Sequence, residues 1–85
     1  MAASVEIYTT KVCPYCVKAK RLLDAKDVDY VEVDVSGDDK ARDDLVKRSE
    51  GRRTVPQIFI NGKAIGGCDD LHALEESGEL DKLLA

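Results

Sequence analysis

The chain has 85 residues, of which 44% are apolar and 35% charged, and its formal net charge is −4. This length predicts one domain, residues 1–85, with a small but self-sufficient core. The acidic balance disfavours nucleic acid as a partner, and no apolar run approaches the roughly 20 residues of a membrane span. Residues 1–4 do not resemble a signal peptide, so we expect a cytoplasmic protein, where thiols stay reduced.

The first third of the chain predicts a strand, a helix and a second strand. Residues 5–9 alternate, which places Val5 and Ile7 on one face of a strand. Residues 14–26 carry apolar side chains at helical spacing. Residues 30–35 alternate again and predict a strand with its valines on one side, Val31, Val33 and Val35. Such a unit is expected to have parallel strands and a right-handed crossover.

The remaining elements predict a second helix, a hairpin and a third helix. Ser36-Gly37-Asp38 supplies turn and cap residues for a helix over residues 38–49, which Gly51 ends. Asn61-Gly62 between the short apolar runs 57–60 and 63–66 indicates a tight β-hairpin. Asp69 or Asp70 caps a helix to about residue 76, followed by a last apolar turn at residues 80–84. The expected architecture is an α/β thioredoxin-like fold, with a four-stranded mixed sheet (βαβ plus hairpin) flanked by three main helices.

The candidate reactive residues lie in Cys13-Pro14-Tyr15-Cys16, between the first predicted strand and the first predicted helix. A cysteine at a helix N-terminus is favoured as thiolate by the free N–H groups and the positive end of the helix dipole. Pro14 suits the first helical position, where its missing N–H costs nothing. Cys16, one turn further in, should be more buried and placed to attack a disulfide formed at Cys13. This pattern indicates a redox-active dithiol.

A zinc site is a second interpretation of the same cysteines. Cys68 and His72, spaced C-x3-H, would complete a Cys3His set. Compact zinc modules usually bring their ligand pairs closer together in sequence than this. The rest of the chain also predicts a packed core that needs no metal, so we expect none.

Three segments together resemble the glutaredoxins, in particular the small bacterial dithiol kind: Cys13-Pro14-Tyr15-Cys16, Thr54-Val55-Pro56-Gln57 and Gly66-Gly67-Cys68-Asp69-Asp70-Leu71. The resemblance covers nearly the whole chain. It implies a monomeric, glutathione-dependent thiol–disulfide oxidoreductase with glutathione as co-substrate and no bound cofactor. Its partners would be disulfide-bearing or glutathionylated proteins, with ribonucleotide reductase among the candidates.

The resemblance also implies residue roles. Cys13 would be the nucleophile and Cys16 the resolving thiol. A cis bond before Pro56 would expose the Val55 backbone to the glutathione cysteine. The start of the third helix would bind the γ-glutamyl carboxylate, with Asp69 or Asp70 on the ammonium, and two arginines would meet the glycine carboxylate. The expected glutathione contacts are Lys11, Tyr15, Arg42, Arg53, Thr54, Val55, Pro56, Gly67, Cys68, Asp69 and Asp70.

The chain departs from the family pattern just before the nucleophile. Relatives usually carry a lysine three residues before it, whereas this chain has Thr10 there and Lys11 one residue later. Val12 replaces a usual small polar residue. Cys68 is expected to be a small residue at a crowded helix start, with a regulatory thiol as the alternative, and His72 is expected to face solvent.

Two further interpretations share the fold. One is a related oxidoreductase reduced by thioredoxin reductase. The other is a binding module that holds an iron–sulfur cluster between two subunits with glutathione as ligand. Pro14 disfavours the second because it stiffens the helix start and removes a donor.

Overall fold

A computed structural model describes residues 3–85 of the chain. Eight elements follow in the order β1 (Val5–Thr9), α1 (Pro14–Ala25), β2 (Val31–Asp34), α2 (Asp39–Arg48), β3 (Gln57–Ile60), β4 (Lys63–Gly66), α3 (Cys68–Ser77) and α4 (Glu79–Leu84). None of the helices in residues 3–85 combines the length and the apolar character that crossing a membrane would require.

The four strands form the mixed sheet that the sequence predicts. Their order is β2-β1-β3-β4; β1 and β2 are parallel, and the other neighbouring pairs are antiparallel. Asn61 and Gly62 connect β3 to β4 with φ values of 52° and 80°. Two consecutive positive φ values match the hairpin turn that Asn-Gly favours.

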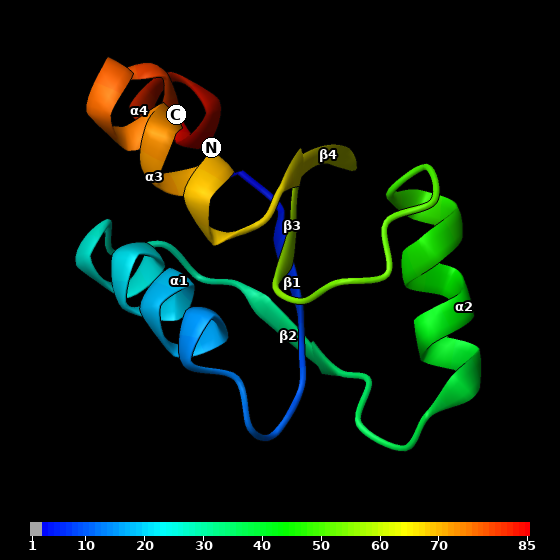
Figure 1. Cartoon of the computed structure of the whole chain (residues 1–85). Coiled ribbons are helices and arrows are strands. Elements are labelled where there is room, and N and C mark those ends of the chain that lie inside the picture. The colour runs from blue at the N-terminus through cyan, green and yellow to red at the C-terminus, as the bar shows by residue number, and fades with distance from the viewer. Residues whose placement is uncertain (1–2) are drawn as a thin grey trace.

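Helices cover both faces of the sheet, with α1, α3 and α4 on one side and α2 on the other (Figure 1). Val5 and Ile7 point toward α1 and α3, where they join a cluster that includes Leu23, Ile58 and Leu71. The opposite face packs a smaller cluster under α2, formed by Tyr8, Val35, Leu45 and Phe59. The alternation in β1 therefore separates two cores, as side chains of a strand point to opposite faces.

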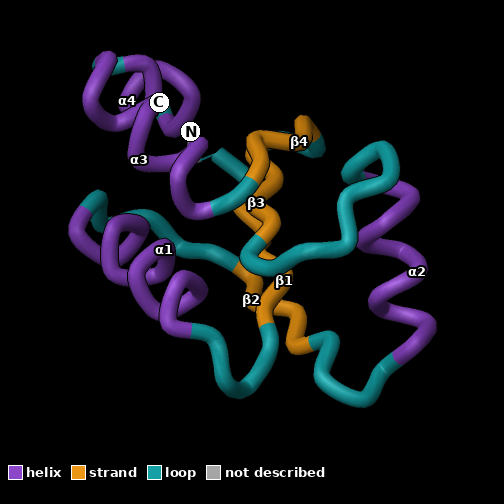
Figure 2. The backbone as a smooth tube through the Cα atoms, in the orientation of Figure 1, coloured by secondary structure: helices purple, strands orange, loops and turns teal. Residues whose placement is uncertain are grey.

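The sheet also determines where the functional loops meet. Tyr8 pairs with Gln57, so the end of β1 lies beside the start of β3. The loop that follows β1 and the loop that precedes β3 consequently emerge at the same end of the sheet (Figure 2). One carries the C-x-x-C segment and the other carries Thr54-Val55-Pro56.

Arg48 fixes the end of α2 to the sheet. Its guanidinium donates to both carboxylate oxygens of Glu6, at 2.8 and 3.0 Å, and to the Tyr8 hydroxyl at 2.9 Å. It also lies 4.3 Å above the centroid of the Phe59 ring. The next residue, Ser49, is buried and donates to the carbonyls of Leu45 and Arg52. The chain is thus held from α2 into the loop that leads to Pro56.

The structure differs from the sequence expectations at three places. Val31, expected to be buried with its neighbours, is 61% exposed. Val31 pairs with Glu6 at the start of the edge strand β2, whereas the apolar cluster under α2 gathers around Val33 and Val35. The last apolar turn is a separate helix, α4, whereas the expected cap of the third helix is confirmed for Asp70, which accepts the N–H of the N-cap residue Gly67. His72 is partly buried instead of facing solvent.

Candidate active site

Cys13 caps the N-terminus of α1. Its backbone is extended, with φ of −153°, and its Sγ accepts the Cys16 N–H at 3.0 Å. Pro14 occupies the first helical position, as predicted. A sulfur at this place receives a hydrogen bond in addition to the positive end of the helix dipole, and both favour negative charge on it.

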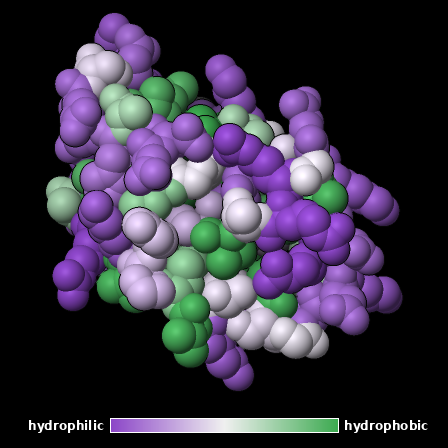
Figure 3. Space-filling model, viewed as in Figure 1, coloured by the Kyte–Doolittle hydropathy of each residue, from purple (hydrophilic) through white to green (hydrophobic). Residues whose placement is uncertain are grey.

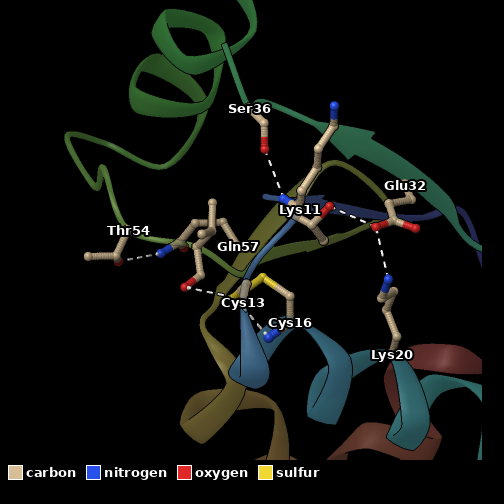
Figure 4. The surroundings of a disulfide bond; sticks show 10 residues. Lys11, Cys13, Cys16, Lys20, Glu32, Ser36, Thr54 and Gln57 are labelled. Carbon is tan, nitrogen blue, oxygen red and sulfur yellow. Dashed lines mark hydrogen bonds and ion pairs between the residues drawn. A yellow bond between two sulfur atoms is a disulfide. The ribbon is translucent and has the colours of Figure 1, made fainter. Parts of the chain in front are cut away.

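Cys13 and Cys16 are joined by a disulfide (Figure 4). The two cysteines differ in accessibility: Cys16 is 1% exposed, while Cys13 is partly exposed. Only Cys13 is therefore open to a disulfide arriving from solvent. Cys16 lies on the buried side, within bonding reach of Cys13.

The segment before β3 lies opposite the dithiol. The Val55 carbonyl oxygen is 4.0 Å from Cys13 Sγ, and the Val55–Pro56 bond is cis. Gln57 is buried and its side-chain amide donates to the Thr54 hydroxyl at 3.2 Å. Backbone polar groups at Val55 thus stand directly across from the sulfur atoms.

A groove of about 260 Å³ extends from this segment to the start of α3. Its walls come from α1, from the loop and first residue of β3, and from the N-terminus of α3. The lining residues are Tyr15, Arg52, Thr54, Val55, Pro56, Gln57, Gly67, Cys68, Asp69 and Asp70.

The α3 wall combines free amides with two carboxylates. One oxygen of Asp70 accepts the Gly67 N–H at 2.9 Å and lies 3.3 Å from Nη1 of Arg52. Asp69 is exposed, and none of the hydrogen bonds among residues 3–85 involves its carboxylate. The first N–H groups of a helix have no partner within it, so this end of the groove suits a carboxylate with an adjacent ammonium group.

Most of the glutathione contacts expected from the sequence lie in this groove, but three lie outside its lining. Lys11 is exposed, its backbone N–H bonds to Ser36 Oγ at 2.8 Å, and its ammonium points away from the disulfide in Figure 4. Arg42 donates to the Arg53 carbonyl at 3.0 Å, which places these two arginines beside each other near the loop. Arg53 itself is exposed.

Arg52 and Gln57 line the groove and were missing from the expected contacts. Arg52 is adjacent to Arg53, and the sequence offers no signal to decide which of two neighbouring exposed arginines turns toward α3. Gln57 belongs to the Thr-Val-Pro-Gln segment. The available signal was a polar residue at the start of the otherwise apolar strand 57–60, because an amide that becomes buried there needs hydrogen-bond partners.

Cys68 is a buried thiol at the start of α3, 5% exposed. Burial raises the pKa of the Cys68 thiol, which disfavours its reactive form. Nδ1 of His72 lies 3.5 Å from its sulfur and 2.9 Å from the Cys68 carbonyl oxygen, one turn along the helix. No cluster of three or more metal-ligating side chains occurs among residues 3–85, so Cys68 and His72 do not join the dithiol in a common site.

A polar bridge connects β1, β2 and α1 near the dithiol (Figure 4). The buried Thr9 hydroxyl donates to Glu32 at 2.7 Å, and Lys20 donates to the same carboxylate oxygen at 3.0 Å. These hydrogen bonds, first from Thr9 and then from Lys20, hold the pKa of Glu32 below its ordinary value. The bridge attaches the middle of α1 to the end of the sheet from which the active-site loops emerge.

Comparison with known proteins gives one consistent result. The glutaredoxin family model matches residues 5–65. The chain is 55% identical to glutaredoxin 3 of Escherichia coli K12 over 82 residues, which cover 96% of this chain and 98% of that protein. It is also 55% identical over 83 residues to a probable glutaredoxin of Synechocystis, covering 98% of this chain and 76% of the relative.

Solved structures agree with the sequence matches. A buckwheat glutaredoxin–glutathione complex superposes with a TM-score of 0.87 at 30% identity, covering 96% of this chain and 76% of that one. The solution structure of glutaredoxin from Brucella melitensis gives a TM-score of 0.85 at 48% identity, covering 98% and 89%.

Proposed function

The chain belongs to the glutaredoxin family and is a thiol–disulfide oxidoreductase, and from that premise we propose how its residues use glutathione. The observation that carries the proposal is the position of Cys13. Its sulfur caps α1, accepts the Cys16 N–H, and lies 4.0 Å from the carbonyl oxygen of Val55, a residue that lines the groove leading to the free amides of α3. A polarised, accessible sulfur beside such a groove supports the proposal of a site for a small anionic thiol.

The reaction is a pair of thiol–disulfide exchanges. In the reduced enzyme, the Cys13 thiolate attacks one sulfur of the substrate disulfide; that S–S bond breaks and the other sulfur leaves as a thiolate, which takes a proton. When both sulfurs of the disulfide belong to one substrate molecule, Cys16 loses its proton and attacks the Cys13 sulfur, the substrate sulfur bonded to Cys13 leaves and takes a proton, and the Cys13–Cys16 disulfide forms. Two molecules of glutathione then reduce this disulfide by the same exchange and leave as glutathione disulfide.

Glutathione would lie along the groove with its sulfur at Cys13. The Val55 backbone, opposite the sulfur, would pair with the backbone of the glutathione cysteine. The amides of Cys68 and Asp69 would bind the γ-glutamyl carboxylate at the start of α3. The Asp69 carboxylate would accept a hydrogen bond from the ammonium of the γ-glutamyl group, because the Asp70 carboxylate already bonds to Gly67 and Arg52.

The opposite end of glutathione would meet basic side chains. Arg42 and Arg53 lie beside each other past the Thr54 end of the groove, where either would bind the glycine carboxylate as the family resemblance implies. Arg52 also lines the groove, but its ion pair with Asp70 places its guanidinium toward the α3 end, away from the proposed position of the glycine carboxylate. Tyr15, 61% exposed beside the dithiol, would cover the bound peptide.

The substrates we propose are glutathionylated proteins and proteins with exchangeable disulfides, ribonucleotide reductase among them. The compartment we propose is the cytosol, where a glutathione pool keeps the dithiol reduced. The exposure of the two cysteines supports exchange with such substrates, because a substrate disulfide can reach Cys13 while Cys16 is buried.

The test is reduction of a glutathione mixed disulfide, coupled to glutathione reductase and NADPH, by the protein and by Cys13→Ser. We expect turnover with the protein and none above background with the variant. A parallel assay replaces glutathione and its reductase by thioredoxin reductase. Turnover only in that second assay would overturn the assignment of glutathione as co-substrate while leaving the dithiol chemistry intact.

A further inference from the structure

Val12 is the most exposed large apolar side chain among the described residues, at 91%, and it directly precedes the nucleophile. Its loop is held in place: the Lys11 N–H bonds to Ser36 Oγ at 2.8 Å, and the Ser36 N–H bonds to Asp34 at 2.8 Å. The loop therefore presents the valine to solvent from a fixed backbone. In Figure 3 apolar atoms protrude at the lower edge of the molecule, where the loop between β1 and α1 lies, with hydrophilic atoms on one side of them.

Val12 lies on the surface next to Cys13 but outside the proposed glutathione groove. The groove is lined on its α1 side by Tyr15, and Val12 is absent from its walls. A tripeptide bound in the groove would leave the valine uncovered. A larger substrate attached to the Cys13 sulfur would have residues beyond its cysteine, and the loop around Val12 is the surface next to them.

The charges around this surface are basic. Lys11 and Lys18 are exposed and take part in no ion pair within residues 3–85. Lys18 is close enough to the groove to act on the Cys68 thiol. The acid beside Lys11 is Asp34, whose carboxylate accepts the Ser36 N–H. The unpaired ammonium groups of Lys11, on the same loop as Val12, and of Lys18, on α1 toward the groove, complement a segment with an apolar residue and nearby carboxylates.

We propose that Val12 is a specificity-determining contact for protein substrates. Its occupant is the extended segment of a substrate protein that carries the disulfide, with an apolar side chain next to the attacked cysteine and acidic residues beyond it. The inference rests on the proposed function, because it concerns the same attack by Cys13. When the Cys13–substrate disulfide forms, the apolar side chain covers Val12, and when Cys16 displaces the substrate, the contact is lost.

The experiment compares two synthetic peptides that each contain one intramolecular disulfide and acidic flanks. In one peptide both cysteines are followed by leucine, and in the other both are followed by serine. The readout is the ratio of kcat/KM for the leucine peptide to kcat/KM for the serine peptide within each protein variant. A ratio taken within one variant cancels any general change in the reactivity of Cys13.

We expect the natural protein to prefer the leucine peptide by about fivefold, below the roughly tenfold minimum for an apolar group in an enclosed pocket, since this contact is open to water on one side. Val12→Ser should bring the ratio close to one. The matched control is Val31→Ser, an exposed valine on the edge strand, which should keep the natural ratio. An unchanged ratio in Val12→Ser, or an equal loss in Val31→Ser, would overturn the inference.

A small glutathione mixed disulfide, assayed with the natural protein, distinguishes this inference from the proposed function. If that compound is turned over but the leucine peptide is not preferred to the serine peptide, the role of Val12 is refuted and the proposed function is retained. Absence of turnover would remove the function itself, and the inference with it.

Discussion

Replacement of Arg48 by methionine should destabilise the protein more than substitutions at partly exposed positions usually do. The change keeps the apolar stem and removes the guanidinium, which bonds twice to Glu6, once to the Tyr8 hydroxyl, and lies over Phe59. The side chains of Arg48 and Glu6 are each a little under one third exposed, so the pair lies between the exposed and the buried case. Charged hydrogen bonds at such a site contribute about 1–2 kcal/mol, and the cation–π contact about 0.5–1 kcal/mol.

The expected loss is therefore about 2–3 kcal/mol of unfolding free energy. For a domain of this size each kcal/mol lowers Tm by roughly 4–8 °C, so the variant should melt roughly 10–20 °C below the natural protein. The measurement is urea and thermal unfolding of the reduced protein at pH 7. Arg21→Met is the control, because Arg21 is exposed on α1 and makes no ion pair within the described chain; it should change the stability by less than about 0.5 kcal/mol.

The ion pair between Arg48 and Glu6 also predicts how the unfolding free energy depends on pH. The Arg48 hydrogen bonds hold the pKa of Glu6 below its ordinary value of 4.5. A carboxyl group with a lowered pKa in the folded state contributes stability that is present above 4.5 and is lost as the pH falls through the folded-state pKa. The difference in unfolding free energy between the natural protein and Arg48→Met should therefore become smaller below pH 4.5. An equal difference at pH 7 and pH 3 would refute a contribution of the ion pair and attribute the loss of stability to packing alone.

The remaining predictions concern the site. Cys16→Ser should keep most of the reduction of glutathione mixed disulfides and lose most of the reduction of protein disulfides, whereas Cys13→Ser loses both; equal losses in Cys16→Ser would exclude a resolving role. In the reduced protein at pH 6, iodoacetamide should modify Cys13 first and Cys68 last, since Cys68 is buried and its pKa is raised, and mass spectrometry gives the order. Asp69→Asn should raise KM for glutathione by about tenfold, in a coupled assay. Asp70→Ala should chiefly lower Tm, because it removes the carboxylate that accepts the Gly67 N–H at the start of α3. A raised KM in Asp70→Ala together with a lowered Tm in Asp69→Asn would exchange the two roles.

The dithiol and its setting could be predicted because they depend on local sequence. Cys13 and Pro14 lie at the end of a strand and the start of a helix, and that order alone places the sulfur at a helix N-terminus. Asn61-Gly62 determines the hairpin in the same way, through two residues that accept positive φ. The βαβ unit then leaves few arrangements of the sheet.

Other features depend on contacts that the sequence pattern does not contain. The alternation of β2 assigns Val31 to a face of the sheet, but the packing of α2 decides how far along the strand that face is covered. The choice between Arg52 and Arg53 at the groove depends on where Asp70 lies after α3 has packed. Asp70 itself serves as a cap from the third position of the helix rather than from its start, because Gly67 occupies the cap position.

The helix that carries the nucleophile is attached at its middle and just past its end. At its middle, Lys20 joins the Glu32 bridge; just past its end, Lys26 forms ion pairs with Glu75, at 2.5 Å, and Asp81, at 2.9 Å, from α3 and α4. A helix held in this way acts as a stiff rod between the sheet and the last two helices. Opening and closing the S–S bond then requires rotation of side-chain bonds at the helix start, and no tilt of the helix. We expect the oxidised and reduced proteins to share one backbone, so that substrates meet the same surface at both stages of the redox cycle.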